Sequence, residues 1–363
     1  MALVGYEANI KNRVGSNQYA FELLKAIHRL DRRNKYVVYL PGPPLADLPK
    51  ERTGWQYRVI GPPRLWNILG LPGALYQQRP KPEVVFNPGH YSPLFFPAPL
   101  VISIMDLGYL HFPGQFTKPI LFKLKFWTAL SIRRARHIFA ISESTKNDIM
   151  KYYGVASDKI TTTYLGYDKS EFHHRLAEAK IAKVRKKYKI SGDYILFLGT
   201  LKPNKNIEGL LKAFKLLDDS QLRLVIAGRK GWLFKSIFNE VKQLGLEKRV
   251  IFTDFVEEED VSALMTGAEV FAQPSFWEGF GIPVVEAMAC GTPVVVSDAG
   301  SLPEIAGEAG IVVNPNKPED IARGIKGALK NRESLVKKGL VQVKKFDWEE
   351  CAKQTIRVLE RIR

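Results

Sequence analysis

The chain has 363 residues, of which 45% are hydrophobic and 25% are charged; this excludes extensive disorder and allows two domains of roughly 150–200 residues each. Two cysteines without metal-ligand spacing exclude a disulfide framework. The sequence has no signal peptide and no run of the roughly 18–20 apolar residues that span a bilayer. Together with the small number of cysteines, these features predict a cytoplasmic protein. The net charge of +17 favours an anionic partner; most of it lies in residues 1–170, where 23 lysines and arginines face 11 aspartates and glutamates.

Short apolar runs alternate with amphipathic stretches along the chain. In the first half the candidate strands are residues 3–7, 36–40, 56–61, 83–89, 101–107, 137–142 and 160–166, and helices are expected at 17–31, 119–135 and 143–153. A polar, basic stretch at 173–189 follows, which we interpret as a hinge. The pattern then restarts, with candidate strands at 194–200, 222–228, 249–256, 269–275, 293–300 and 310–315.

Strands that are apolar on both faces and alternate with helices are typical of parallel sheets covered by helices. Two such series predict an α/β protein with two Rossmann-like domains. In open sheets of this kind, ligands bind beyond the carboxyl ends of the strands. We therefore expect the two parallel sheets to face each other across a cleft, with the functional residues directly after the strands.

The most informative motif is PSFWEGFGIPVVEAMACG at residues 274–291. It predicts a buried strand, a glycine-rich turn that a ligand can approach closely, and a helix that starts near Pro283. The N–H groups at the start of such a helix suit a diphosphate. Glu278 and Glu286 then flank the phosphates and can accept hydrogen bonds from sugar and ribose hydroxyls. The alternative is an ordinary turn with two surface glutamates.

A second motif, GTLKPNKN at residues 199–206, follows the first strand of the second half and precedes an expected helix at 207–217. A glycine and lysines at the end of a strand suit phosphate binding. We interpret Lys205 as functional and Lys202 as a solvated surface lysine.

At these residues the sequence resembles the family-4 retaining glycosyltransferases, whose fold is the two-Rossmann GT-B type. The family signature has two glutamates separated by seven residues, with Gly-Phe-Gly after the first, and residues 278–286 match it. The resemblance implies that Glu278 contacts the transferred sugar and that Glu286 contacts the ribose of a nucleotide-sugar donor. The turn residues that it places at the donor are Gly279, Phe280, Gly281 and Ile282.

The same resemblance assigns further donor contacts. Lys205 matches the diphosphate-binding lysine of the family. Thr200 stands where many members have arginine, and Arg229 is the candidate to supply that phosphate contact. Weaker matches place four more residues near the donor: Phe255 and Val256 beside the base, and Gly300 and Ser301 beside the phosphates.

The last residues of the chain, 346–363, resemble the final helix of GT-B enzymes, which returns to the first domain. The resemblance therefore implies an acceptor-side domain at 1–172, completed by a helix at 348–363. It implies a donor-binding domain at 190–347.

The acceptor half carries weaker signals. Residues 13–19, RVGSNQY, resemble a family loop in which Gly15 lies close to the donor; a plain turn capped by Ser16 or Asn17 is an equal alternative. The family strand that matches 101–107 usually ends in His-Asp-Leu, and the histidine lies close to the reacting sugar. Here that position is Met105, which cannot exchange a proton. Asp106 remains a catalytic candidate, and we do not assign the vacant role to His111.

A basic stretch with aromatic residues occupies 117–137, and residues 64–79 add Trp66 and other apolar residues. Such a helix can lie in an anionic membrane interface. It can equally face the interior with a basic outer side. We expect peripheral contact with the inner face of the plasma membrane through 117–137.

We therefore expect a retaining glycosyltransferase with no metal ion and no cofactor beyond a nucleotide-sugar co-substrate. A GDP-mannose-like donor is favoured over a UDP-sugar, and the acceptor is a glycan or lipid-linked acceptor of polysaccharide or cell-envelope assembly. The alternatives are a related GT-B enzyme, such as a nucleotide-sugar epimerase or a glycan phosphorylase, and a non-catalytic basic module that binds membrane or nucleic acid. No RNA-binding or zinc motif supports nucleic acid as a partner.

Overall fold

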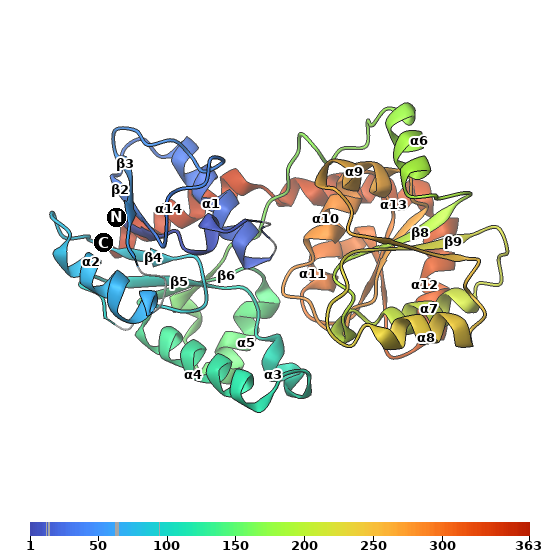
Figure 1. The fold of residues 1–363 in the computed structure, drawn as a ribbon, viewed down its shortest axis with the longest axis horizontal. Helices are drawn as coiled ribbons and strands as arrows, with labels where there is room; N and C mark the ends of the chain where they lie inside the picture. Colours follow the sequence, from blue (N-terminus) through green and yellow to red (C-terminus); the bar gives the residue numbers. More distant parts are fainter. Residues whose placement is uncertain (12, 14, 62–64, 94) are drawn as a thin grey trace. The chain divides into compact units, whose positions relative to one another are not determined.

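The computed structural model describes residues 1–11, 13, 15–61, 65–93 and 95–363. These residues form two compact α/β units, which Figure 1 shows with their element labels. The first unit comprises Met1–Gly166 together with Asp347–Arg363, and the second comprises Tyr167–Phe346. The domain ranges expected from the sequence were 1–172 with 348–363, and 190–347.

The first unit is built on a seven-stranded sheet in the order β3-β2-β1-β4-β5-β6-β7. Every pair of neighbouring strands is parallel. Its strands are β1 (Ala2–Val4), β2 (Tyr36–Leu40), β3 (Trp55–Val59), β4 (Val85–Asn87), β5 (Leu100–Ile104), β6 (His137–Ala140) and β7 (Ile160–Thr162).

Helices cover both faces of this sheet in Figure 1. Helices α1 and α14 pack against each other on one face, and α2, α4 and α5 lie on the other. The helices of this unit are α1 (Ser16–Leu30), α2 (Leu71–Gln77), α3 (Gly108–His111), α4 (Lys118–Arg134), α5 (Glu143–Tyr153) and α14 (Trp348–Ile362).

The second unit is built on a six-stranded parallel sheet in the order β10-β9-β8-β11-β12-β13. Its strands are β8 (Tyr194–Leu198), β9 (Arg223–Ala227), β10 (Val250–Asp254), β11 (Val270–Gln273), β12 (Val294–Ser297) and β13 (Gly310–Val313). The central strands are buried throughout, which explains their nearly continuous apolar sequences.

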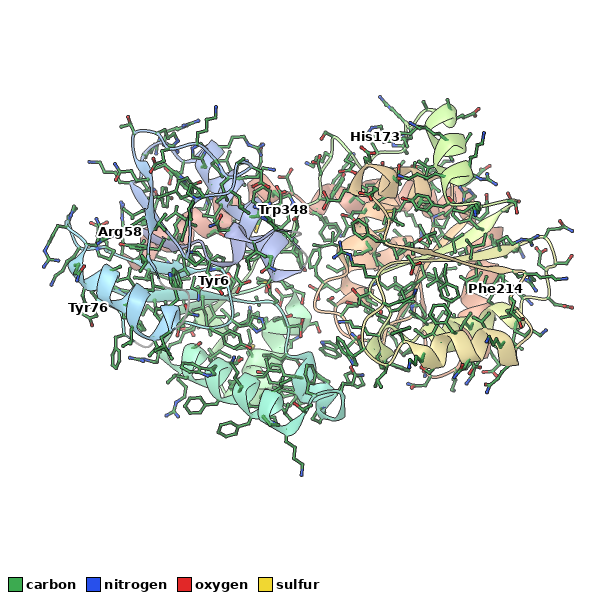
Figure 2. The ribbon with its side chains drawn as sticks, in the orientation of Figure 1. Tyr6, Arg58, Tyr76, His173, Phe214 and Trp348 are labelled. Atoms are coloured by element: carbon green, nitrogen blue, oxygen red, sulfur yellow. The ribbon has the colours of Figure 1, made fainter. Side chains whose placement is uncertain are left out.

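Two groups of helices sandwich this second sheet. Helices α7, α8 and α12 cover one face, where Phe214, labelled in Figure 2, is buried under the guanidinium group of Arg249 at 4.5 Å. The helices of this unit are α6 (Glu178–Lys187), α7 (Ile207–Lys215), α8 (Lys235–Gln243), α9 (Glu258–Thr266), α10 (Ile282–Ala289), α11 (Leu302–Ala306), α12 (Pro318–Lys330) and α13 (Arg332–Gln342).

Local signals set several of these boundaries. The hydroxyl of Ser142 accepts the backbone N–H of Thr145 and so caps the start of α5, which ends at Gly154 in the left-handed conformation. The carboxylate of Asp347 caps α14 by accepting the N–H groups of Glu349 and Glu350. An anionic cap is stabilising there because the start of a helix carries partial positive charge.

Each sheet has one point where the strand order reverses. In the first sheet it lies between β1 and β4, and in the second between β8 and β11. At such a switch point the two following loops diverge toward opposite faces and leave a crevice beyond the strand ends. The loops after β1, β4, β8 and β11 are therefore the places where each unit can bind a ligand.

The predicted fold class, two Rossmann-like units with parallel sheets, is confirmed. All thirteen expected strands are present. Residues 36–40 are matched in full; β1, β3 and β5 begin one residue before the expected range, and the other strands are shorter than expected at one or both ends. The expected hinge at 173–189 is wrong as a bare linker. Helix α6 forms within it and packs on α9 through buried Val184, because three isolated apolar positions suffice to anchor a short basic helix.

Gly166 is the position where the first unit is most tightly packed against α14. A Cβ atom at Gly166 would lie 2.2 Å from the backbone nitrogen of Trp348 and 2.6 Å from its ring, whose place Figure 2 marks. We predict that Gly166→Ala lowers the free energy of unfolding by at least about 2 kcal/mol, because the clash is with backbone that cannot move aside. Thermal unfolding checks this, with Gly114→Ala, which meets nothing within 4 Å, as the control. Equal melting temperatures for the two variants would contradict the prediction.

Candidate active site

The switch point of the second sheet brings Lys205 and Glu278 together. Lys205 ends a 3-10 turn, Pro203–Lys205, after β8, and Glu278 lies in the turn after β11. The two strands are neighbours in the sheet although 73 residues separate the side chains. The ammonium group of Lys205 donates to Oε1 of Glu278 at 2.5 Å, and both side chains are nearly buried, with 14% and 13% of their surface exposed.

Glu278 is held in its ionised form by a set of donors. Besides Lys205, its Oε1 accepts hydrogen bonds from Ser275 Oγ at 2.7 Å and from Gln273 Nε2 at 2.9 Å. Burial alone would raise the pKa of this carboxyl group. The charge and hydrogen bond of Lys205, with the two neutral donors, outweigh burial and hold the pKa of Glu278 below its usual value. Glu278 is therefore an oriented carboxylate.

Asn206 fixes the loop that carries Lys205. It is buried and takes the left-handed conformation at the start of α7. Its amide donates to the carbonyl oxygens of Pro274, after β11, and Pro315, after β13, at 3.0 and 2.7 Å. One side chain thus joins the loops after three strands of the sheet.

The loop after β12 supports the glycine-rich turn from the other side. The hydroxyl group of Ser301 donates to the carbonyl oxygens of Glu278 and Phe280, at 3.1 and 2.9 Å. Gly300, at φ +60°, lies so close that a Cβ atom there would be 2.4 Å from the carbonyl oxygen of Glu278. Gly281 precedes α10 at φ +94°. The turn therefore has glycines at the positions where the backbone takes a positive φ or approaches another loop closely.

The other turn residues divide between core and surface. The ring of Phe280 is buried and packs edge-on against Phe346 at 5.7 Å, so its side chain is part of the core. Any ligand contact at Phe280 would come from its backbone. Gly279 is partly exposed beside it, and Ile282 is the first residue of α10.

Four predicted donor residues follow the ends of β8, β9 and β10. The guanidinium group of Arg229 lies 4.2 Å above the ring of Phe255, which is 45% exposed. Val256 is buried, and Thr200 is exposed after β8. Arg229 and Phe255 thus offer a cation stacked on an aromatic face, which suits a planar or anionic ligand group.

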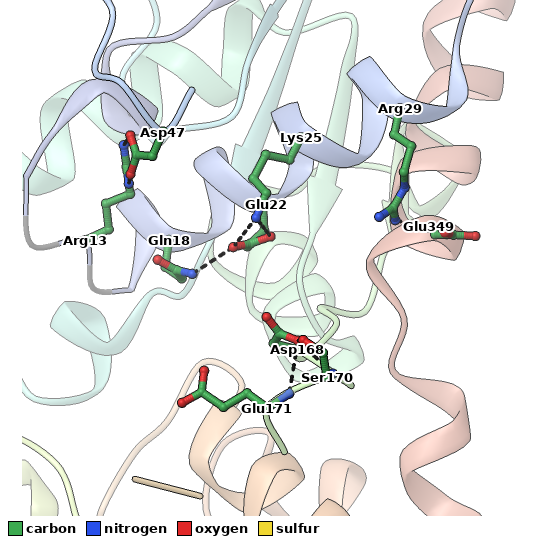
Figure 3. Close-up of polar contacts among 10 residues, drawn as sticks. All are labelled: Arg13, Gln18, Glu22, Lys25, Arg29, Asp47, Asp168, Ser170, Glu171 and Glu349. Atoms are coloured by element: carbon green, nitrogen blue, oxygen red, sulfur yellow. Dashed lines mark hydrogen bonds and ion pairs between the residues drawn. The ribbon is translucent and has the colours of Figure 1, made fainter. Parts of the chain in front are cut away.

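Glu286 and Glu171 form a pair of acidic groups that the sequence motifs only half revealed. Glu286 lies on α10, and Glu171 follows a turn in which Asp168 accepts backbone N–H groups, as Figure 3 shows. Burial, and then the charge of Glu171, raise the pKa of Glu286 to about 8. Burial also raises the pKa of Glu171, whose Oε1 is buried without a hydrogen-bond partner among the described residues. No motif marks Glu171; only its position before the apolar Phe172 hints at burial.

In the first unit, Gly15 lies between β1 and α1. It takes φ +57° at the start of α1, where neither Ser16 nor Asn17 provides the cap that the alternative interpretation required. Arg13 anchors this loop through a bidentate ion pair with Asp47, shown in Figure 3. Its guanidinium group is therefore already neutralised. Gly15 thus has a positive φ of the kind that favours glycine.

Asp106 follows β5 in the first unit and has a structural task. Its Oδ1 accepts the backbone N–H of Gly108 at 2.8 Å and so starts α3. Met105 before it is nearly buried. Nε2 of His111 is hydrogen-bonded to the carboxylate group of Asp148 at 2.9 Å. This agrees with leaving His111 out of the role that Met105 cannot fill.

The donor set at the second switch point suits a particular kind of ligand. A lysine, an arginine and the N–H group of Ile282 at the start of α10 can attract phosphate oxygens, while Glu278 and Glu286 can accept hydrogen bonds from hydroxyl groups. Within the described ranges, no three histidine, cysteine, aspartate or glutamate side chains are grouped as metal ligands. Cations and hydrogen-bond-accepting carboxylates thus occur together at this switch point.

Comparison with known proteins identifies the family and the fold. Residues 180–359 match the sequence model described as glycosyl transferases group 1, and residues 14–171 match that of glycosyltransferase family 4. Solved structures share the fold: Anabaena HepE in complex with UDP and glucose has a TM-score of 0.76 at 19% identity, covering 99% of this chain and 98% of that one. WaaG, a glycosyltransferase involved in lipopolysaccharide biosynthesis, has a TM-score of 0.74 at 16% identity, covering 99% of each chain. The architecture is thus that of a GT-B glycosyltransferase.

With both models matched, the chain belongs to the family-4 glycosyltransferases. It is 37% identical over 233 residues to O-antigen chain mannosyltransferase B of Escherichia coli, covering 62% of this chain and 61% of that protein. It is 32% identical over 234 residues to O-antigen chain mannosyltransferase RfbU of Salmonella typhimurium, covering 64% and 61%. The alignments thus span about three fifths of the length of these relatives.

The raised pKa of Glu286 predicts a pH-dependent stability. The folded protein keeps this proton up to about pH 8, whereas the unfolded chain loses it near the ordinary value of 4.5. The free energy of unfolding therefore falls as pH rises between these values. Glu286→Gln stays neutral, so relative to wild type it gains at least about 1.4 kcal/mol, the value of one pKa unit, between pH 5 and pH 8.

Urea unfolding of both proteins at pH 5 and pH 8 measures this gain. The control is Glu247→Gln, which changes an exposed glutamate of the same unit. Identical pH slopes for wild type and Glu286→Gln would show that Glu286 is ionised in the folded protein.

Proposed function

We propose that this protein is a retaining glycosyltransferase that moves a hexose from a nucleotide-sugar donor to a glycan or lipid-linked acceptor of polysaccharide or cell-envelope biosynthesis. The observation that carries the proposal is the ion pair between Lys205 and Glu278 at the switch point of the second sheet. In this proposal the second unit binds the donor and the first unit binds the acceptor. The reaction takes place in the cytoplasm or at the inner face of the plasma membrane.

The ion pair explains how one site holds both a diphosphate and a sugar. Lys205 neutralises Glu278 and directs part of its charge to the phosphates when the donor binds. Glu278, kept ionised and fixed by Ser275 and Gln273, then accepts hydrogen bonds from the hydroxyl groups of the transferred sugar. Glu286, on α10, accepts from the ribose.

Charge on the departing nucleotide is the main barrier that the site must lower. Lys205, Arg229 and the N–H groups at the start of α10 are fixed donors at this edge of the sheet, and preorganised donors of this kind stabilise charge that develops in a transition state. The attacking hydroxyl approaches from the face that the nucleotide leaves and gives its proton to a phosphate oxygen. This route retains the anomeric configuration and requires no metal ion. Phe255 and Val256 lie beside the base.

A GDP-mannose-like donor is favoured over a UDP-sugar. The support is the likeness to two proteins named O-antigen chain mannosyltransferases, at 37% and 32% identity. Those relatives are matched over only 61% of their length, so the sugar is part of the proposal.

We predict that Glu278→Gln and Lys205→Ala each lower the rate of mannosyl transfer from GDP-mannose by at least about 100-fold, because each removes a fixed group from the transition state. Release of GDP and formation of product with octyl α-mannoside as acceptor measure the rates. Lys202→Ala, three residues away and over the ring of Trp232, is the matched control and keeps its activity.

The same assay tests the rest of the mechanism. NMR of the product reports an unchanged anomeric configuration, and activity persists in EDTA. An inverted product, or loss of activity in EDTA, would exclude the mechanism. Conversion of the donor without any acceptor would instead identify an epimerase, and no turnover by wild type with any nucleotide sugar would identify a non-catalytic binding module.

Contact with an anionic membrane through 117–137 is a second part of the proposal. Helix α4 exposes Ile120, Phe122 and Phe126 among Lys118, Lys123 and Lys125, a set that we call the aromatic–basic face. Phe122 and Phe126 stack at 6.0 Å and are 70% and 52% exposed. Exposed aromatic rings beside lysines suit the boundary between lipid headgroups and acyl chains. Among the described residues, no helix has the length and apolar character needed to cross a membrane.

Trp66 was expected to add to this surface, and that expectation is wrong. Its ring is 2% exposed, packs against Tyr6 and donates to the carbonyl oxygen of Ile60. A buried indole with a satisfied N–H group belongs to the core. This segment instead exposes Leu65, Leu69 and Tyr76, which are 57%, 64% and 49% exposed.

We predict that Phe122→Ser with Phe126→Ser weakens binding to phosphatidylglycerol vesicles at least about tenfold, since each buried phenylalanine contributes about 1.5–3 kcal/mol. Cosedimentation measures the bound fraction, and added salt weakens what remains. Leu233→Ser, a 72% exposed apolar residue of the second unit, is the control. Equal binding by the double variant would remove the aromatic–basic face from the proposal.

A further inference from the structure

The loop after β9 carries an exposed apolar tip that the proposed function does not use. The loop joins β9 to α8, both labelled in Figure 1, and includes Trp232 and Leu233, which are 44% and 72% exposed. In parallel α/β sheets, ligands bind at the carboxyl ends of the strands, where this tip lies. Tryptophan is enriched among the residues that contribute most to binding. The tip is therefore a candidate for a second binding site.

Hydrogen bonds fix this tip to the loop after β8. The backbone N–H of Leu201 donates to the carbonyl oxygen of Arg229, and that of Gly231 donates to the carbonyl oxygen of Leu201, both at 2.9 Å. A Cβ atom at Gly231 would lie 2.7 Å from the oxygen of Leu201, so glycine is required for this approach. Trp232 therefore follows a fixed backbone, next to the loop that carries Lys205.

A strained turn follows Trp232. Leu233 takes φ +58°, a positive angle that a leucine rarely adopts. The hydroxyl group of Ser236 donates to the carbonyl oxygen of Leu233 at 3.0 Å and so stabilises this conformation. Backbone strain persists only where the surrounding structure enforces it, and it clusters at functional segments. Such a turn beside an exposed indole ring points to a function for the ring.

Lys202 orients the indole ring. Its ammonium group lies 5.2 Å from the centre of the ring of Trp232, within the range of a cation–π contact. Lys202 directly follows Leu201, so the ring and the ammonium group are both anchored by the same pair of backbone hydrogen bonds. The exposed part of the ring is thus a flat apolar surface that can bind a ligand without first losing conformational freedom.

Charged groups of both signs surround the tip. Lys230 pairs with Asp254 at 3.0 Å, and Glu208 accepts a hydrogen bond from the hydroxyl group of Ser236 at 2.7 Å. Because carboxylates lie among the cations, this setting disfavours a phosphate or an anionic lipid surface. It offers donors and acceptors around an apolar face. A pyranose ring fits this chemistry, since its C–H face is apolar and its hydroxyl groups both donate and accept.

A nucleobase can also stack on an indole ring. In the proposed function, however, the base lies beside Phe255, whose ring already has the guanidinium group of Arg229 over it at 4.2 Å. Trp232 therefore remains for the other substrate, the acceptor.

We propose that Trp232 is the platform of a glycan-binding subsite on the second unit. One pyranose ring of the acceptor packs its C–H face on the indole ring, and a different ring of the acceptor receives the transferred sugar. The inference rests on the proposed function and specifies its acceptor as a chain of at least two sugars. Octyl α-mannoside has one sugar ring and does not reach the subsite, so Lys202→Ala keeps its activity with that acceptor.

Acceptors of different length test the subsite. The full chain is assayed with GDP-mannose and with either methyl α-mannoside or α-linked mannotriose as acceptor. We expect Trp232→Ala to raise the KM for mannotriose about 3- to 10-fold, the effect of losing one aromatic stacking contact. The KM for methyl α-mannoside changes less than about twofold, because one sugar ring does not use the subsite. Trp232→Phe keeps an aromatic face and restores most of the affinity for mannotriose.

The matched control is Leu216→Ala. Leu216 is an apolar residue of the same unit that lies outside the tip and is 46% exposed, and its substitution is expected to change neither KM. An equal rise of both KM values in Trp232→Ala, or an unchanged KM for mannotriose, overturns the inference.

A binding measurement separates this inference from the proposed reaction. In ¹H–¹⁵N NMR spectra the indole signal of Trp232 is the one that Trp232→Phe lacks, and we expect mannotriose or maltotriose to shift it. A shift without turnover retains the glycan subsite and rejects the proposed activity. If neither trisaccharide shifts the signal, the inference is overturned even in an active enzyme. If GDP alone shifts it, the ring belongs to the donor site, and the inference is likewise overturned.

Discussion

The arrangement of the second unit depends on placing a lysine against a glutamate away from water. An isolated charge in such a position is costly, and each of Lys205 and Glu278 is tolerated because the other is there. Ser275 and Gln273 complete the hydrogen bonding of the carboxylate. A buried pair of this kind contributes little net stability. Its value lies in holding an ionised carboxylate at one orientation, ready for a ligand whose phosphates compete for the lysine.

The two sheets solve the problem of ligand access in the same way. Both reverse their strand order once, and in each case charged or polar groups that are distant in sequence meet at the reversal. The second sheet gathers cations and carboxylates, while the first gathers Glu7, His90 and Asp106. The contrast in charge between the two sets gives the units different chemical tasks on the same architecture, because the fold supplies positions and the loops supply chemistry.

The fold could be predicted from the sequence because buried parallel strands appear in it as short apolar runs with turn residues between them. The Glu278 motif could be predicted because its residues are contiguous. Glu171 and His90 could not, since each acquires its setting from strands or helices far away in the chain. The prediction for Trp66 was wrong for a related reason. In the sequence an indole suggests an interfacial residue, and only the packing around Tyr6 and Ile60 shows that the ring is interior.

Asn206 has a consequence for altering this protein by design. Because its amide joins the loops after β8, β11 and β13, those loops hold their shape as a set. Grafting one of these loops from a homologue would break a buried hydrogen bond of the Asn206 amide group and disturb the other two loops. Attempts to retarget the donor should therefore transplant all three segments together, or confine changes to the exposed ring of Phe255, which lies outside this network.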